Sequence, residues 1–254
     1  MKIVAVTQAR MSSTRLPGKV MKQVDGKTLL EIHIERILQS RRITELVVAT
    51  TTELEDEAIA MLAARLNVKF YRGSLNNVLD RFYQAVAPLS PDYVVRLTSD
   101  CPLIDATLID AVIDFTVDAN VDYCSNTLEP VYPDGMDVEV MRFEALEAAW
   151  KNATLKSEQE HVTPYIYKNS DYMQGQLFTA KAFGLTTGNY SHVRLTVDEP
   201  RDLEVIKRVV ADLGLNKNWK TYADYYLTQP TIQALNANTT RNEGYSKSIK
   251  QDNL

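Results

Sequence analysis

Apolar and polar residues alternate with two different periods over the first 120 residues. Residues 3–7 form a short β-branched run, and residues 28–40 then carry apolar side chains on one side at helical spacing. The same alternation predicts further strands at 46–50, 68–71 and 93–97, and further helices at 54–66, 78–86 and 106–117. Strands that alternate with helices indicate an α/β fold with a mainly parallel central sheet, which binds ligands at the carboxyl ends of its strands.

The alternation loosens after residue 122. The later elements expected are strands at 136–141 and 192–197 and helices at 143–152, 158–168 and 202–213. We expect a single domain over residues 1–228, followed by a C-terminal extension, 229–254. The scattered apolar residues of this extension predict a segment that wraps the surface or frays.

The composition narrows the class of partner. The chain has 254 residues, 45% of them hydrophobic, with a net charge of −5 and a pI near 5.3. General nucleic-acid binding needs a broad basic face, so no nucleic-acid partner is expected. The longest unbroken apolar run, 58–64, is far too short to span a bilayer, and the stretch 3–6 is too short for a signal peptide. We therefore expect a cytoplasmic protein with no membrane partner.

Cysteine, histidine and glycine each exclude a class of site. Two cysteines without Cys-x-x-Cys spacing suit a reducing compartment, three histidines lack a metal-ligand spacing, and nine glycines form neither a dinucleotide-binding nor a P-loop motif. Charge is uneven as well: residues 1–42 carry nine Lys and Arg against three Asp and Glu, a net +6 that leaves −11 for the remainder. This asymmetry predicts a small anionic ligand bound by the N-terminal segment.

The loop after the first predicted strand, residues 8–19, reads Gln-Ala-Arg-Met-Ser-Ser-Thr-Arg-Leu-Pro-Gly-Lys. Its backbone N–H groups and the hydroxyls of Ser12 and Ser13 can donate to phosphate oxygens. The cations that can neutralise the phosphates are Arg10, Arg15 and Lys19. The loop therefore predicts a polyphosphate site, and the alternative is a solvated basic loop.

Two aspartates each follow an apolar, β-rich segment and precede a proline by two residues. Asp100 follows the predicted strand 93–97, and Asp198 follows 192–197. A carboxylate beside phosphates is a ligand that Mg²⁺ prefers, and neighbouring strand ends would bring the two together. The alternatives are a turn or helix cap for Asp100, and an N-cap of the helix near Pro200 for Asp198.

Taken in order, these and later segments resemble the CMP-sugar synthetases, the cytidylyltransferases that activate Kdo and sialic-type acids, and among them the spore-coat polysaccharide biosynthesis protein F group. The segments that carry the resemblance are 8–19 with 26–27, 47–51, 72–74 with 78–82, 96–105, 132–140, 160–167, 197–204 and 242–245. The resemblance implies a three-layer Rossmann-like nucleotidyltransferase fold. It places a nucleotide-binding half at about 1–120 and insertions for sugar binding and dimerisation at about 121–190.

The resemblance also implies roles for single residues. Asp100 and Asp198 would form one Mg²⁺ site, and Arg10 and Lys19 would act with them in catalysis by binding the triphosphate. The remaining nucleotide-side candidates are Ala9, Arg72, Asp80 and Arg81. Kdo-type enzymes carry Gln-Gly where this chain has Thr-Ser at 98–99, so the choice of CTP stays open at that turn.

The candidates for the sugar side are six later residues: Asp134, Asp137, Glu139, Glu160, His161 and Tyr165. His161 lies on the predicted helix 158–168, where the alternative role is that of a hydrogen-bonded structural histidine. Asp137 and Glu139 alternate with apolar residues, so we expect them on one face of the strand 136–141, turned toward either a hydroxylated ligand or water.

One activity and two alternatives follow. We expect a Mg²⁺-dependent enzyme that transfers CMP from CTP to an octulosonic or nonulosonic sugar acid, releases pyrophosphate, serves the biosynthesis of surface polysaccharide or glycan, and forms a homodimer. The first alternative is a nucleotidyltransferase for another NTP, or a glycosyltransferase, on the same fold. The second is a non-catalytic nucleotide-binding subunit of a polysaccharide pathway.

Overall fold

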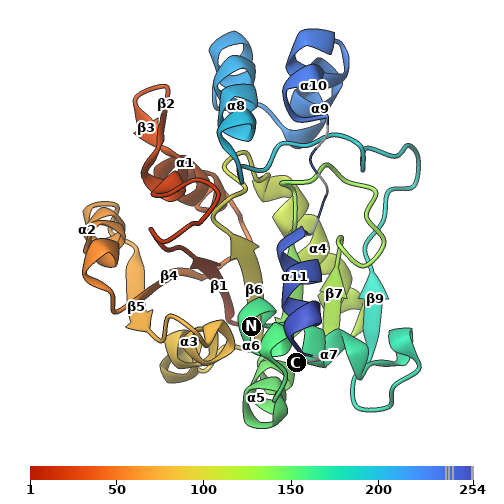
Figure 1. The fold of residues 1–254 in the computed structure, drawn as a ribbon. Coiled ribbons are helices and arrows are strands. Elements are labelled where there is room, and N and C mark those ends of the chain that lie inside the picture. The colour runs from red at the N-terminus through yellow and green to blue at the C-terminus, as the bar shows by residue number, and fades with distance from the viewer. Residues whose placement is uncertain (238, 240, 242, 253–254) are drawn as a thin grey trace.

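The computed structural model of the chain describes residues 1–237, 239, 241 and 243–252, and a seven-stranded sheet lies at its centre (Figure 1). The strands of this sheet are β1 (Ile3–Gln8), β4 (Glu45–Thr51), β5 (Lys69–Gly73), β6 (Tyr93–Thr98), β7 (Tyr123–Ser125), β8 (Glu139–Arg142) and β9 (Ala180–Ala182). Their order is β5-β4-β1-β6-β8-β7-β9, and β8 alone runs antiparallel to its neighbours. The predicted α/β class with a mainly parallel sheet is confirmed.

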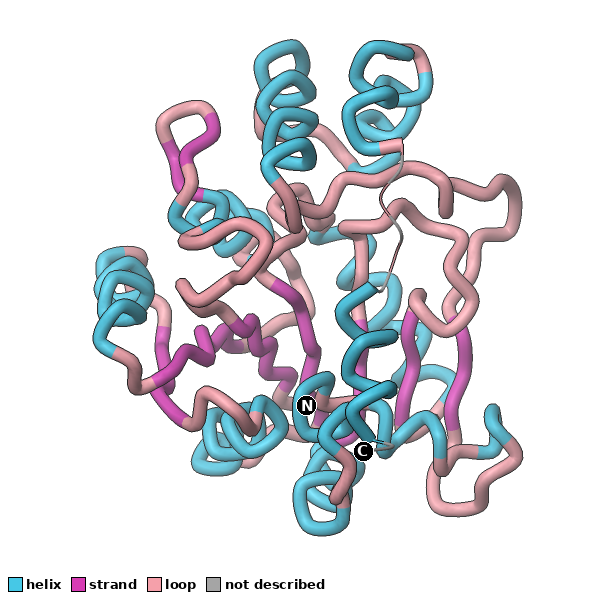
Figure 2. Tube along the Cα trace, viewed as in Figure 1, coloured by secondary structure: helices cyan, strands magenta, loops and turns pink. Residues whose placement is uncertain are grey.

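Helices cover both faces of the sheet, as Figure 2 shows. They are α1 (Leu29–Ile37), α2 (Glu57–Arg65), α3 (Val78–Val86), α4 (Ala106–Ala119), α5 (Phe143–Asn152), α6 (Lys156–His161), α7 (Pro164–Lys168), α8 (Pro200–Leu213), α9 (Trp219–Leu227), α10 (Pro230–Asn236) and α11 (Glu243–Asp252). Alternate residues of β1 face opposite layers: Ile3 and Ala5 share a core with α1, α2 and α4, and Val4 and Val6 share one with α3 and α5. A two-stranded ribbon, β2 (Gln23–Val24) and β3 (Lys27–Thr28), precedes α1. No helix in the described part of the chain is long and apolar enough to cross a membrane.

The periodicity predicts α3 and α5 to the residue, but two later predictions are wrong. The expected helix 158–168 is two helices, α6 and α7, because Val162 adopts φ 70° and Pro164 begins a new helix. The expected strand 192–197 is an extended segment outside the sheet, and its one β-bridge joins Arg194 to Asp134.

Two further expectations change with the structure. Strand β8 begins at Glu139, so Asp137 lies before it and the two side chains do not share a strand face. The extension 229–254 was expected to wrap the surface or to fray; it contains α10 and α11, and α11 packs against α6, so fraying is the alternative that the structure excludes for α11. Asn242, the first residue of the segment 242–245, lies outside the described residues.

A glycine allows the segment 192–197 to lie against the turn before β8. The N–H of Asp134 donates to the carbonyl of Val193 (2.9 Å), and the N–H of Leu195 donates to the carbonyl of Asp134 (2.7 Å). Gly135 follows with φ 107°, and a Cβ there would lie 2.6 Å from the backbone of Leu195. Only glycine fits this close approach, because any other side chain meets rigid backbone.

We expect Gly135→Ala to lower the free energy of unfolding by about 2 to 4 kcal/mol, since it combines a strained φ with a backbone clash. Gly26→Ala is the matched control: its φ is 76°, but a Cβ there would meet nothing within 4 Å. Gly26→Ala should lower the free energy of unfolding by only ~1 kcal/mol. Urea unfolding measures both values, and equal losses would contradict the role given to the close approach.

Candidate functional site

A cleft of about 810 Å³ opens at the carboxyl ends of β1 and β6. It has the size and position expected for a ligand site in an α/β fold. The predicted site residues that line it are Ala9, Arg10, Ser13, Arg15, Lys19, Arg81, Asp100, Asp134, Asp137, Glu160, His161 and Asp198. The structure thus brings together residues from the first and the last third of the chain.

The predicted residues that do not line the cleft are Ser12, Arg72, Asp80, Glu139 and Tyr165. Ser12 is exposed on the loop. Arg72 forms an ion pair with Glu57 and donates to two backbone carbonyls. Asp80 accepts a hydrogen bond from the indole of Trp150 (2.9 Å). Arg72 and Asp80 are therefore held by contacts with residues that do not line the cleft.

Lys19 joins the two predicted metal ligands. Its Nζ lies 3.2 Å from Asp100 Oδ2 and 3.0 Å from Asp198 Oδ1, and it also donates to the carbonyl of Val197 (3.0 Å). Burial opposes the charge on Lys19, but the two carboxylates outweigh it and raise the pKa of the ammonium. Burial also opposes the charge on Asp100, and Lys19 outweighs it, so the pKa of Asp100 is lowered. The two aspartates meet at one positive charge, the ammonium of Lys19.

Backbone contacts between two loops bring the aspartates together. Asp100 follows β6, and its carbonyl accepts hydrogen bonds from the N–H of Val197 (2.8 Å) and the hydroxyl of Thr196 (3.1 Å). The expected cause, two neighbouring strand ends in one sheet, is wrong, because the segment that carries Asp198 forms no sheet strand. The segment instead docks directly on the turn that carries Asp100.

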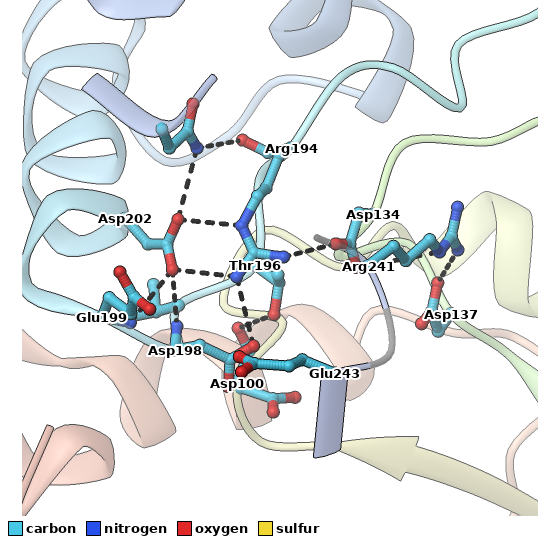
Figure 3. A network of polar contacts seen from close by, with 12 residues as sticks. Asp100, Asp134, Asp137, Arg194, Thr196, Asp198, Glu199, Asp202, Arg241 and Glu243 are labelled. Carbon is cyan, nitrogen blue, oxygen red and sulfur yellow. Dashed lines mark hydrogen bonds and ion pairs between the residues drawn. The ribbon is translucent and has the colours of Figure 1, made fainter. Parts of the chain in front are cut away.

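Arg194 fixes the orientation of Asp198 (Figure 3). Its side chain is only 7% exposed and contacts three carboxylates: Asp134 (2.6 Å), Asp198 Oδ2 (3.1 Å) and Asp202 (2.9 Å). Asp202 in turn accepts from the backbone N–H of Asp198 (3.0 Å). With Oδ2 tied to Arg194, the other oxygen of Asp198 faces Lys19 and the guanidinium of Arg15, 2.8 Å away.

Acidic residues crowd the other end of the cleft. Arg241 contacts Asp137 at 2.7 Å and Asp134 at 3.9 Å (Figure 3). Burial raises the pKa of Asp137 to about 7 although Arg241 opposes the change. Beneath this end, Glu139 pairs with Arg96. The structure thus places Glu139 under the cleft floor, where Arg96 separates it from the cavity.

Two further guanidinium groups line the cleft, those of Arg10 and Arg81. Within the described residues, neither Arg10 nor Arg81 forms an ion pair. Arg81 is 2% exposed, donates to the carbonyl of Ser74 (2.8 Å), and leaves its Nε without a partner. Burial and the nearby charge of Arg10 lower the pKa of Arg81 to about 10. Asp56 opposes this shift but forms no ion pair with Arg81, and a buried positive charge without an ion pair favours an anionic ligand.

Three arginines of the site were not among the sequence candidates: Arg96, Arg194 and Arg241. The first two had a readable signal, since each interrupts an apolar run that is otherwise buried. A charge in such a run needs a partner, and both have one. Arg241 lies in a polar stretch where nothing in the local pattern distinguishes it.

The donor set fits Mg²⁺ that is shared with a nucleotide. Asp100 and Asp198 already converge on a cation, the ammonium of Lys19. Among the described residues, no group of three or more His, Cys, Asp or Glu side chains is placed to hold a metal. Mg²⁺ commonly binds one or two carboxylates and takes its other ligands from phosphate and water. The pair therefore suits a Mg²⁺ ion that arrives with phosphates better than a permanent metal site.

A buried histidine holds the turn that carries Asp100. His33 lies on α1 and is fully buried, with Nδ1 2.8 Å from the carbonyl of Cys101 and Nε2 2.9 Å from the hydroxyl of Thr7. The carbonyl can only accept, so Nδ1 carries the hydrogen and Thr7 donates to Nε2. Burial lowers the pKa of His33 to about 4, which keeps the ring neutral.

The neutral ring predicts a pH-dependent stability. The unfolded state binds a proton on His33 below about pH 6.5 and the folded state only below about pH 4. The contribution of neutral His33 to the free energy of unfolding is therefore complete above pH 6.5 and is lost as the pH falls to 4. The free energy of unfolding should fall by roughly 3 kcal/mol over this range because of His33. Urea unfolding between pH 7 and pH 4 should give a shallower dependence for His33→Gln than for the wild type.

The exposed His192 provides the control for this experiment. His192→Gln should keep the pH dependence of the wild type. A wild-type dependence retained in His33→Gln would show that other groups cause it.

Comparison with known sequences finds similar proteins that match most of the chain. A profile described as cytidylyltransferase matches residues 4–236. An uncharacterized protein of Methanocaldococcus jannaschii is 39% identical over 94% of this chain and 96% of its own length. Spore coat polysaccharide biosynthesis protein SpsF of Bacillus subtilis is 31% identical over 84% of this chain and 88% of its own length. A shorter match, 32% identical over 48% of this chain and 47% of the relative, is to 3-deoxy-manno-octulosonate cytidylyltransferase of Geobacter metallireducens.

Solved structures give the same result for the fold. A cytidylyltransferase from Leptospira borgpetersenii superposes with a TM-score of 0.85 at 30% identity, covering 94% of this chain and 98% of that one. A CMP:2-keto-3-deoxy-manno-octonic acid synthetase complexed with CTP superposes with a TM-score of 0.62 at 17% identity, over 84% of this chain and 99% of that one. The second likeness concerns the fold alone.

Proposed function

This chain belongs to the cytidylyltransferase family, and we propose that it transfers CMP from CTP to a sugar acid, with Mg²⁺ bound and pyrophosphate released. One observation carries the proposal: Asp100 and Asp198 converge on Lys19 in a cleft where, within the described residues, Arg10 and Arg81 form no ion pair. The names of two relatives support the acceptor class, since one is a cytidylyltransferase for a sugar acid and the other belongs to polysaccharide biosynthesis. The homodimer and the cytoplasmic location stay predictions.

The nucleotide end of the cleft would bind the triphosphate. Within the described residues, Arg10 and Arg81 form no ion pair, so their guanidinium groups can bind phosphate without breaking one. Arg81 is also held rigid by burial. Asp56 fixes the loop after β1 by accepting a hydrogen bond from the backbone N–H of Met11 (2.7 Å). A loop that is already fixed positions phosphates at a smaller ordering cost.

The reaction is the attack of an acceptor hydroxyl oxygen on the α-phosphorus of CTP. A P–O bond forms to the acceptor, the bond to the β-phosphate breaks, and the hydroxyl proton passes to solvent or to the departing pyrophosphate. Asp100 and Asp198 would hold Mg²⁺, which when bound polarises phosphate oxygens. Lys19, which contacts both carboxylates, would neutralise the charge that builds on the leaving pyrophosphate.

We assign the acceptor to the part of the cleft that is lined by later residues, which we call the acceptor end. Asp137, Glu160 and His161 line it and offer donors and acceptors for several hydroxyl groups. Burial lowers the pKa of His161 to about 4, so at neutral pH the ring is uncharged. A neutral imidazole and carboxylates can orient a polyhydroxylated ligand by hydrogen bonds.

We expect Asp100→Asn and Asp198→Asn each to lower kcat/KM by about 100-fold or more, because each removes a charge that holds Mg²⁺ against the phosphates. The double variant should be little worse than either single one, since the two carboxylates act as a unit. Pyrophosphate release with CTP and the acceptor measures all three.

Asp114→Asn is the matched control for these variants. Asp114 is an exposed aspartate that pairs with Arg42 outside the cleft. It should keep the wild-type rate. Near-normal rates in either Asn variant at the cleft would reject the two-carboxylate site.

Nucleotide and acceptor choice can be tested in one screen. We expect pyrophosphate release with CTP and a sugar acid such as 3-deoxy-manno-octulosonate, and much less with UTP, GTP or ATP. Turnover with another NTP, and none with a sugar acid, would favour the first alternative, a different transferase on the same fold. CTP binding without any turnover would favour the second alternative, a non-catalytic nucleotide-binding subunit.

Lys19→Ala should weaken CTP binding or turnover, measured by calorimetry and by the same assay of pyrophosphate release.

A further inference from the structure

The last helix, α11, lies apart from the helices that precede it. Figure 1 shows α11 beside α6, away from α8, α9 and α10. It lies beyond residues 4–236, which the family profile matches. It nevertheless lines the cleft with Glu243, Tyr245 and Ser248. The helix is therefore part of the wall of the site.

Two residues of α11, Tyr245 and Ser248, are bonded to the α6–α7 segment, which carries two of the residues that we assign to the acceptor. Ser248 is 4% exposed, donates to Glu160 (2.7 Å), and lies 3.0 Å from His161 Nε2. The hydroxyl of Tyr167 donates to that of Tyr245 (2.6 Å). These contacts hold α11 across the residues that we assign to the acceptor.

The first turn of α11 reaches the nucleotide loop. Glu243 forms an ion pair with Arg15 Nη1 (3.1 Å), and Nη2 of the same guanidinium pairs with Asp198 (2.8 Å). Arg15 thus links three parts of the site: the loop after β1, the metal-ligand candidate and the C-terminal helix. Its side chain is 30% exposed and that of Glu243 is 41% exposed, so both can change partners without unpacking the core.

Phosphates and Glu243 need the same cation. Arg15 belongs to the loop that would neutralise the triphosphate, and a carboxylate beside a triphosphate is repelled by it. A guanidinium that turns toward phosphate oxygens gives up its present fork between Asp198 and Glu243. Glu243 then loses its ion pair with Arg15 and lies in a less favourable electrostatic position.

We propose that Glu243 competes with the nucleotide phosphates for Arg15, so that nucleotide binding releases the first turn of α11 beside the acceptor end of the cleft. Glu243 thereby sets the affinity for the nucleotide, and the C-terminal helix responds to occupancy of the phosphate site. This inference rests on the proposed nucleotide site, and its test uses inorganic triphosphate as well as CTP so that the two can fail separately.

Calorimetry with MgCl₂ in every sample compares the wild type, Glu243→Gln and Asp252→Asn. Glu243→Gln should bind CTP and inorganic triphosphate about threefold to fivefold more tightly, the size of a partly exposed ion pair. Asp252→Asn is the matched control, because it makes the same charge change in the same helix, where Asp252 contacts the N–H of Ser157 (2.8 Å) and not Arg15. It should change neither affinity by more than about twofold.

Hydrogen exchange of the peptide that contains 243–252 reports the helix itself. CTP should speed exchange of this peptide in the wild type, and Glu243→Gln should exchange fast with or without CTP. Unchanged affinity in Glu243→Gln, an equal gain in Asp252→Asn, or slower exchange on CTP binding would each overturn the competition.

The triphosphate arm separates this inference from the proposed function. If the wild type binds triphosphate but not CTP, the proposed function fails and the triphosphate affinities alone decide the competition. If neither ligand binds, both proposals fall.

Discussion

Two carboxylates that meet at one point need a positive charge between them, and this constraint organises the cleft. Asp100 and Asp198 would repel each other without Lys19, which contacts both. The loop after β1 must therefore close over the turn after β6, and the segment that carries Asp198 must dock on that same turn. The carbonyl of Asp100, which accepts two hydrogen bonds from this segment, provides the docking point.

A buried ion network, more than the sheet, keeps the later segment in place. Arg194 is buried, and its guanidinium contacts the carboxylates of Asp134, Asp198 and Asp202. Removing a partner from a buried network leaves an uncompensated charge, which costs several kcal/mol. Gly135 completes the arrangement, since its missing side chain lets the Asp134 turn approach the segment closely. The acidic end of the cleft is thus fixed to the metal-ligand candidates by the same arginine.

The sequence pattern predicts the parts of the fold that depend on local periodicity. Helix α3 has a strongly one-sided apolar face, and its bounds are predicted to the residue. The segment 192–197 is as buried as a strand, but periodicity cannot distinguish a sheet strand from an extended chain that docks on two loops. Helix α11 was predicted to wrap or fray for a related reason: its sequence is polar, and its position depends on contacts with α6 that lie about 90 residues earlier in the chain.

The candidate site could be predicted where the functional residues are recognisable from the segment in which they lie. The basic loop and the two aspartates were identified in this way, and the structure brings them into one cleft. Arg241 could not be identified, because its role depends on Asp134 and Asp137 across the fold. Arg72 and Asp80 stand in segments that resemble the family, yet their side chains are bonded elsewhere. Segment resemblance gives position along the chain, and only packing decides which way a side chain points.

The cations of the cleft fall into two classes that respond differently to a ligand. Arg10 and Arg81 have no carboxylate partner among the described residues, so an anion gains their attraction without breaking an ion pair. Lys19 and Arg15 already hold carboxylates, so an anion reaches them only by exchange. Cations without an ion pair thus supply affinity, and paired cations supply coupling, because every exchange breaks an ion pair to another segment. For Lys19 the carboxylates that lose this pair are the two that suit Mg²⁺, and for Arg15 one of them lies on the C-terminal helix.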